Sequence, residues 1–163
     1  MRNVTTGMFM RSALLLGFWG MLALAAAPVA AQSAPRDARS VVVPSNVAWT
    51  NTLLRVKRGQ WLRFEPSGEI RLSFDRDDTS LPAGSRSNRR SERAPFPAIP
   101  LGALIGKVNS GQPFSIGAVT QAFQMPANGT LFLGVNDDHV QDNSGNYVVK
   151  VWEVPGSLVL QLQ

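Results

Sequence analysis

Carboxylate and amide side chains are concentrated in GVNDDHVQDNSGNY, residues 134–147, between two short apolar runs. Asp137, Asp138, Asp142 and Asn143 fall within seven positions. Calcium binds roughly six to eight oxygen atoms from carboxylates, amides, backbone carbonyls and water. A loop that closes on itself would bring these side chains together, and a cation would relieve the repulsion between the carboxylates. The pattern therefore predicts a calcium site, while a hairpin turn rich in Asp and Asn is the alternative that composition leaves open.

His139 lies inside the same loop and is the only histidine of the chain. The donors around it are hard oxygen atoms, which suit calcium better than zinc. We therefore interpret its side chain as an exposed loop residue. The loop does not match the helix-loop-helix calcium motif, which closes with a glutamate. Gly145 is expected to allow a tight exit from the loop into the strand that follows.

The N-terminus has the order of a secretory signal, with Arg2 and Arg11, an apolar run and then small residues up to Ala31. This order predicts a signal peptide over residues 1–31 and an exported protein, periplasmic or secreted, with a retained membrane anchor as the alternative. The net charge of +5 falls to +3 once the two arginines are removed. So mild a charge does not favour a nucleic-acid partner. No second apolar span follows, which predicts no transmembrane segment after cleavage, and the lack of cysteine excludes disulfide bonds.

Short apolar or alternating segments, separated by Gly, Pro, Asn or Asp, fill the chain from residue 41 onward. They predict strands over 41–43, 46–56, 60–65, 69–74, 103–108, 113–117, 120–125, 130–136 and 146–154. Strands this short and this numerous predict an all-β fold, an antiparallel, jelly-roll-like β-sandwich of about eight strands over residues 41–154. Residues 32–40 are expected to form a flexible lead-in. Residues 155–163 form either a C-terminal tail or an extra edge strand.

Residues 75–100 interrupt this pattern with a polar, proline-rich insertion that has no periodicity. Loops this long within a compact domain are usually functional or disordered. Its segment RSNRRSER, residues 86–93, contains four arginines. We interpret it as a solvated loop or as a contact for phosphate, lipopolysaccharide or an acidic glycan.

Three blocks of the chain resemble the calcium-dependent galactophilic lectins of bacteria, the PA-I type. The most specific block is Asn136-Asp137, a short loop and then Asp142-Asn143-Ser144-Gly145, which resembles the calcium loop of that family. In NTLLRVKRGQWLRFEPSGEIRL, Gly59 and Gly68 have the nine-residue separation that the family shows. LGALIGKVNSGQPFSIG, residues 101–117, resembles the central pair of strands. The resemblance extends over nearly the whole exported chain.

This resemblance implies a small jelly-roll sandwich in which one calcium bridges protein and sugar, with two sugar hydroxyls completing its coordination. It implies metal ligation by the side chains of Asp137, Asp142 and Asn143 and by the carbonyls of Leu72 and His139, with Val140 as the less favoured alternative to His139. It implies carbohydrate contacts at Asp137, Asp138, Asp142 and Asn143. The partner is then a carbohydrate, galactose-like or otherwise. A homo-oligomer is also compatible with this reading, since weak sugar sites gain from multivalency.

Two departures separate the chain from the galactose binders. The loop between Asp137 and Asp142 is about two residues shorter, and the mid-chain insertion lacks the histidine and glutamine that hold the exocyclic hydroxyl of the sugar. Calcium binding therefore carries over better than galactose specificity. Arg89, Arg90 or Arg93 could reach the sugar instead and favour an acidic one.

Enzyme motifs are scarce in the chain: it has no phosphate-binding glycine loop, no zinc-helix motif, no cysteine and no nucleophile elbow. We therefore expect no catalytic activity. The main prediction is a calcium-dependent, lectin-like protein. The alternatives are a structural or assembly domain of the envelope whose ion only stabilises the fold, and an accessory domain that tethers a partner.

Overall fold

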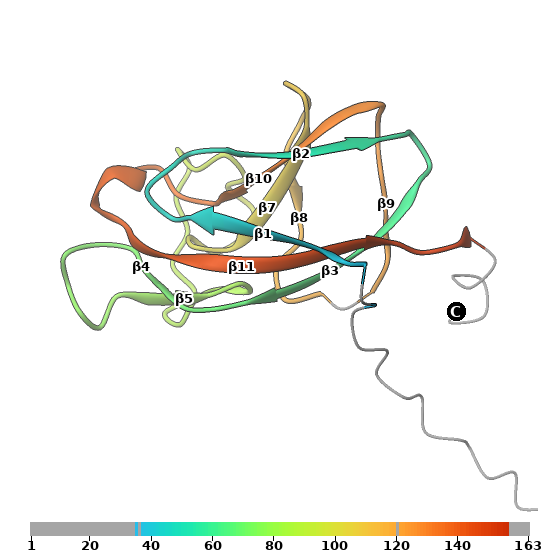
Figure 1. Cartoon of the computed structure of the whole chain (residues 1–163). Helices are drawn as coiled ribbons and strands as arrows, with labels where there is room; N and C mark the ends of the chain where they lie inside the picture. Colours follow the sequence, from blue (N-terminus) through green and yellow to red (C-terminus); the bar gives the residue numbers. More distant parts are fainter. Residues whose placement is uncertain (1–34, 36, 120, 157–163) are drawn as a thin grey trace, which may run out of the picture. The chain divides into compact units, whose positions relative to one another are not determined.

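The computed structural model describes residues 35, 37–119 and 121–156. Within them the chain forms an all-β, antiparallel sandwich, as predicted (Figure 1). The strands are β1 (Arg39–Pro44), β2 (Thr50–Val56), β3 (Trp61–Ser67), β4 (Ile70–Arg71), β5 (Thr79–Leu81), β6 (Gly84–Ser85), β7 (Leu104–Val108), β8 (Phe114–Ser115), β9 (Phe123–Gln124), β10 (Gly129–Val135) and β11 (Ser144–Glu153), with a short 3₁₀ helix, η1 (Val140–Asp142). The predicted signal peptide, residues 1–31, and most of the predicted tail, residues 157–163, lie outside the described residues. Among the residues described, no helix is long and apolar enough to span a membrane.

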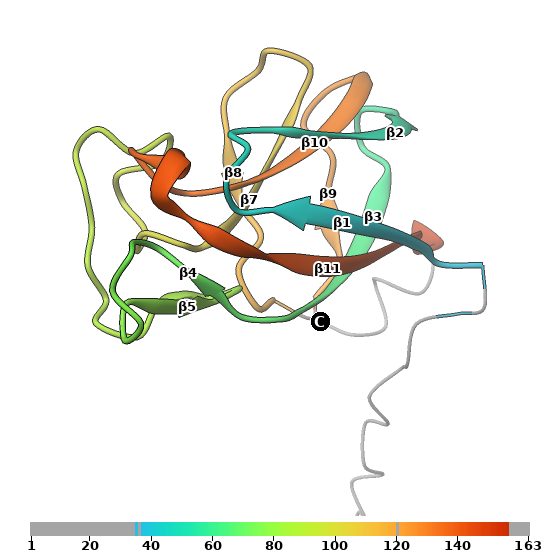
Figure 2. The same cartoon turned by 60° about the vertical axis from the view of Figure 1, so that its left-hand side comes forward.

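Two sheets face each other in the sandwich (Figure 2). One has the order β6-β5-β4-β11-β3-β9, with β1 paired to the other edge of β11, and the second has the order β2-β10-β7-β8. Strand β11 is the longest and pairs with β1, β3 and β4, all antiparallel. Strands β3 and β4 pair with β11 in one continuous register, and β1 pairs with its other edge. Strand β11 therefore connects the N-terminal strand with the strands of the insertion in one sheet.

Alternating apolar side chains from both sheets fill the space between them. On β3, Leu62 and Phe64 are buried and Trp61 and Arg63 are only half-buried, as the alternation in GQWLRFE predicted. On β10 and β11 the inward residues include Leu131, Leu133, Tyr147 and Val149, all fully buried. Burying such side chains stabilises a fold by about 1.5–3 kcal/mol each, so this core holds both ends of the loop between β10 and β11 firmly.

Strand boundaries differ from the predicted ones where pairing partners are short. The lead-in predicted for residues 32–40 ends earlier, because β1 begins at Arg39, opposite Val151. The predicted strand 69–74 is reduced to β4, and 113–117 is reduced to β8. In these places apolar residues continue the pattern, but no neighbouring strand continues the ladder.

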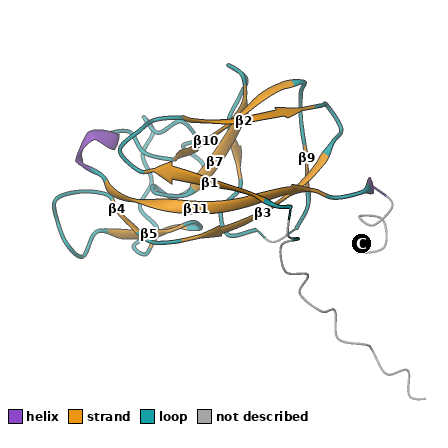
Figure 3. Cartoon of the chain, in the orientation of Figure 1, coloured by secondary structure: helices purple, strands orange, loops and turns teal. Residues whose placement is uncertain are grey.

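The insertion of residues 75–100 contains two strands that the sequence did not predict. Strand β5 pairs with β4 and strand β6 pairs with β5, which extends the first sheet into the insertion. Gly84 begins β6 directly after the connecting turn and has a φ of +118°, a conformation that glycine adopts readily. These strands are two or three residues long and mostly polar, so no alternation marks them. Figure 3 shows that β4, β5 and η1 lie at the same end of the sandwich.

Candidate calcium and ligand site

The acidic loop that joins β10 to β11 begins with a buried carboxylate. Asp137 is 8% exposed and directly follows the fully buried Asn136. One carboxylate oxygen, Oδ1, accepts a hydrogen bond from the backbone N–H of His139 at 2.8 Å. The other, Oδ2, accepts one from Nδ2 of Asn143 at 3.3 Å. Asp137 and Asn143, six positions apart in the sequence, are thus in direct contact.

Burial raises the pKa of Asp137, and the nearby carboxylates Asp138 and Asp142 raise it further. The hydrogen bonds from His139 and Asn143 act in the opposite direction but do not outweigh the burial. A buried carboxylate in a field of like charges is stabilised by a cation, which supplies the missing opposite charge.

Two oxygen atoms next to Asp137 are buried and have no hydrogen-bond partner among the described residues: Oδ1 of Asp142 and Oδ1 of Asn143. Buried polar atoms are nearly always paired, because leaving one unpaired costs about 1–3 kcal/mol. Here the amide nitrogen of Asn143 donates twice, to Asp137 and to the carbonyl of Ser45 at 3.2 Å, so its oxygen is turned away from these two acceptors. Thr50 has the third unpartnered atom in the described part of the chain, and it belongs to strand β2.

Three neighbouring residues thus supply buried side-chain oxygens, namely Asp137, Asp142 and Asn143. This donor set fits a hard cation such as calcium, which prefers carboxylate and amide oxygens. Within the described residues no three His, Cys, Asp or Glu side chains converge on one metal position. The donor set therefore relies on the amide oxygen of Asn143 and needs backbone carbonyls or ligand oxygens to complete it. It suits zinc or copper less well, because these ions favour imidazole or thiolate ligands.

Two of these residues, Asp137 and Asp142, line a pocket of about 660 Å³ that is open to solvent. Asn143 is not among the lining residues and adjoins the pocket through its contact with Asp137. Leu72, whose carbonyl the sequence analysis assigned to the ion, lines the same pocket as Asp137 and Asp142. His139 also lines it and is exposed, as expected for its side chain. The complete lining is Leu72, Ser73, Asp75, Asp77, Asp78, Thr79, Arg86, Ser87, Arg89, Arg90, Ser91, Leu101, Asp137, Asp138, His139 and Asp142. The acidic loop and the insertion therefore form one site.

Asp138 differs from the other residues of the loop because its carboxylate is already occupied. Its Oδ2 accepts a hydrogen bond from the hydroxyl of Ser91 at 2.7 Å and forms an ion pair with Arg93 at 3.3 Å. The hydrogen bond from Ser91 is the main reason that the pKa of Asp138 is lowered. Asp138 lines the pocket, but in this structure its carboxylate ties the insertion to the acidic loop.

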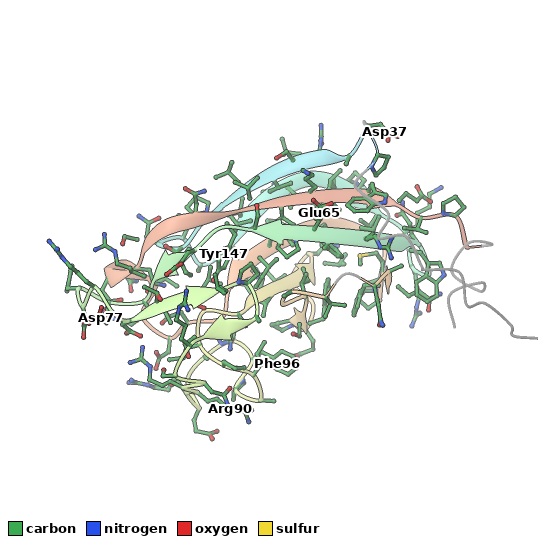
Figure 4. All side chains as sticks on the ribbon, turned by 90° about the horizontal axis from the view of Figure 1, so that it is seen from below. Asp37, Glu65, Asp77, Arg90, Phe96 and Tyr147 are labelled. Atoms are coloured by element: carbon green, nitrogen blue, oxygen red, sulfur yellow. The ribbon has the colours of Figure 1, made fainter. Side chains whose placement is uncertain are left out.

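Asn136 makes a second connection between the acidic loop and the insertion, one that sequence reasoning missed. Its side chain accepts a hydrogen bond from the N–H of Phe96 at 2.9 Å and donates to the carbonyls of Phe96, Ile99 and Pro100 at 3.0–3.2 Å. The sequence showed only an asparagine at a strand end, where a turn role is the usual reading. Figure 4 shows the segment around Phe96 on the same side of the domain as Arg90.

Glycine has a definite role where β11 leaves the loop. Gly145 has a φ of +90°, and a Cβ there would lie 3.2 Å from the carbonyl oxygen of Glu69. Its own carbonyl accepts hydrogen bonds from the N–H and the hydroxyl of Ser45, at 3.1 and 2.9 Å. The predicted tight exit is confirmed, and it places Asn143 against the β1–β2 connection.

No protein-family model and no curated protein matches the chain. Among solved structures it is similar to one described as the EclA N-terminal domain, a PllA-like lectin, with a TM-score of 0.58 and 24% sequence identity. The match covers 71% of this chain and 95% of that one. At this identity the likeness shows a shared fold, here that of a lectin domain.

Proposed function

We propose that the protein is an exported, non-catalytic carbohydrate-binding protein that binds its sugar through a calcium ion. The observation that carries the proposal is the pair of buried, unpartnered oxygens of Asp142 and Asn143 beside the buried carboxylate of Asp137. Asp137 and Asp142 line a pocket open to solvent, and Asn143 contacts Asp137, so a ligand can approach this group of oxygens from the pocket. The fold shared with a PllA-like lectin supports the same reading.

In this proposal Asp137, Asp142 and Asn143 hold the ion by side-chain oxygens, and the carbonyls of Leu72 and His139 are further ligands. Bound calcium supplies open coordination positions that sugar hydroxyls can occupy. The protein residues hold this arrangement in place. Ser45 and Asn136 fix the two ends of the loop, and Asp138 attaches the insertion that forms the wall of the pocket.

Thermal unfolding of residues 32–163 with chelator, with calcium, and with calcium plus single sugars tests the proposal. A ligand that binds only the folded state, at a hundred times its dissociation constant, adds about 2.7 kcal/mol of stability. We expect a calcium-dependent rise in Tm, with a further rise for one class of sugar only when calcium is present. Magnesium is the control ion, because it requires a stricter geometry.

The alternative is an ion that only stabilises the fold, and the contact from Asn143 to Ser45 favours it, since it joins the loop to the β1–β2 connection. In that case calcium would raise the Tm and no sugar would add to the rise. A Tm unchanged by millimolar calcium would overturn both functions and leave the loop a plain turn.

A further inference from the structure

The arginine-rich part of the insertion contributes to the same pocket as the acidic loop. Arg86, Arg89 and Arg90 line the pocket together with Asp137 and Asp142. From the sequence alone, these arginines were assigned either to a solvated loop or to a contact for an anionic group. In the structure they form a basic wall beside the proposed ion position.

The three arginines differ in how strongly they are held. Arg89 forms a short ion pair of 2.7 Å with Asp78, whose side chain is only 16% exposed, so this guanidinium is committed to the protein. Arg86 reaches Glu69 at 3.4 Å, both side chains being largely exposed, and its Nε donates an exposed hydrogen bond to the hydroxyl of Thr79 at 3.2 Å. Such exposed pairs contribute little, about 0–1 kcal/mol, and separate readily.

Arg90 has neither an ion pair nor a side-chain hydrogen bond among the residues that the structure describes, and it is exposed at the pocket. A guanidinium offers five N–H donors in a planar fork that matches carboxylate or sulfate oxygens. Arg90 is therefore available to bind an anion. Arg86 can act as a second donor, because breaking its exposed contacts costs little free energy.

Charge is unevenly distributed around the pocket. Asp75 and Asp77, which form no ion pair among the described residues, lie in the part of the insertion between β4 and β5, whereas Arg86 and Arg90 follow β6. Figure 4 shows Asp77 and Arg90 well apart, at different edges of the domain. An anionic group would be repelled by the carboxylates of Asp75 and Asp77 and attracted to Arg86 and Arg90, which gives the pocket an orientation.

We propose that the carbohydrate bound here is acidic, with its ring hydroxyls at the ion site and its carboxylate or sulfate held by Arg90. This inference rests on the proposed function, because it assigns the substrate class of that site. A neutral sugar would use the ion site alone and leave the arginine wall in water.

Calorimetric titration of the purified protein in saturating calcium tests this, with methyl galactoside, galacturonic acid and galactose 6-sulfate as probes. We expect the acidic probes to bind at least about tenfold more tightly than the neutral one, as for a charge-assisted hydrogen bond. The variant Arg90→Gln should remove about tenfold of affinity for the acidic probes and leave the neutral probe within about twofold. The matched control is Arg58→Gln, which makes the same charge change in the β2–β3 connection, where Arg58 lines a separate hollow.

The outcomes separate this inference from the proposed function. If the neutral probe binds in calcium as tightly as the acidic ones, the acidic preference is wrong while the lectin function stands. If Arg90→Gln and Arg58→Gln weaken acidic probes equally, general charge attraction replaces the assigned contact and the inference fails. If no probe binds although calcium raises the Tm, sugar binding fails as well, and both conclusions are overturned for this ligand class.

Discussion

Asn136 and Asn143 lie at the two ends of one loop and both are buried, but their side-chain amides differ in how completely they are hydrogen-bonded. Asn136 has both its oxygen and its nitrogen engaged by the backbone of residues 96–100. Asn143 uses its nitrogen twice and leaves its oxygen without a partner. A purely structural amide is expected to be fully satisfied. The contrast separates an end of the loop whose amide is fully hydrogen-bonded from an end whose free oxygen we assign to the proposed ion site.

The largest expected effect is on the structural end. Asn136→Ala removes four hydrogen bonds between a fully buried side chain and the backbone of the insertion, so we expect a loss of at least about 3 kcal/mol of unfolding free energy. Urea unfolding measured by circular dichroism, with and without calcium, checks this. The exposed Asn146→Ala is the control. A loss below about 1 kcal/mol, or one that calcium restores, would place Asn136 with the ligand site instead.

The next largest effect is expected at Asp137, in the proposed ion site. Asp137→Asn keeps the shape of the side chain but removes the buried charge, so the calcium-induced rise in Tm should disappear. Without calcium the variant should be as stable as the parent protein or more stable, because a buried carboxylate among like charges is lost. Differential scanning fluorimetry with calcium or chelator measures both quantities, with the exposed Asp37→Asn as control. An undiminished calcium response in Asp137→Asn would contradict the assignment.

The pH dependence of stability should distinguish Asp137 from its neighbour Asp138. Burial raises the pKa of Asp137 above its ordinary value of 3.8. Its contribution to calcium-free stability is therefore full below pH 3.8 and is lost as the pH rises through the raised pKa. The hydrogen bond from Ser91 lowers the pKa of Asp138, so its contribution is present above pH 3.8 and is lost as the pH falls through the lowered value.

We therefore expect the stability difference between parent protein and Asp137→Asn, without calcium, to move in favour of the variant as the pH rises above about 4. Chemical unfolding in chelator between pH 3 and pH 7 measures this difference. A difference that stays constant over that range would mean that Asp137 titrates normally.

The smallest effect concerns the link between the loop and the insertion. Ser91→Ala removes the hydroxyl that holds Asp138 and should cost about 1.5 kcal/mol, the lower end for a hydrogen bond to a charged group, because the bond is only partly buried. Calcium affinity should change little, since this carboxylate is already engaged by the insertion. Calcium titration followed by tryptophan fluorescence measures the affinity, and Ser87→Ala, at an exposed position of the same pocket wall, is the matched control. A tenfold weaker calcium affinity would show that Asp138 takes part in ion binding.

The local features of the site could be predicted from sequence because they lie within one short segment. Asp137, Asp142 and Asn143 are six positions apart at most, and a strand on each side leaves the loop few ways to close. The alternation in β3 and the antiparallel sandwich were predictable for the same reason, since a period of two residues shows which face is buried.

Long-range contacts were not predictable in this way. Ser45 is hydrogen-bonded to Asn143, 98 positions away in the sequence, and Ser91 to Asp138, 47 positions away. No sequence pattern around either serine indicates these contacts. The strands β5 and β6 were missed because they are short and polar and depend on pairing with β4 rather than on their own side chains. The role of Asn136 was missed because its partners are backbone groups, which any sequence possesses.

The most direct test of the account is a crystal structure of the protein grown with calcium. We predict one ion bound by oxygens of Asp137, Asp142 and Asn143 at about 2.3–2.6 Å, with at least one position facing the pocket occupied by water or sugar. An ion-free loop at saturating calcium would contradict the ion site. An ion enclosed entirely by protein atoms would retain the site but contradict binding of carbohydrate through it.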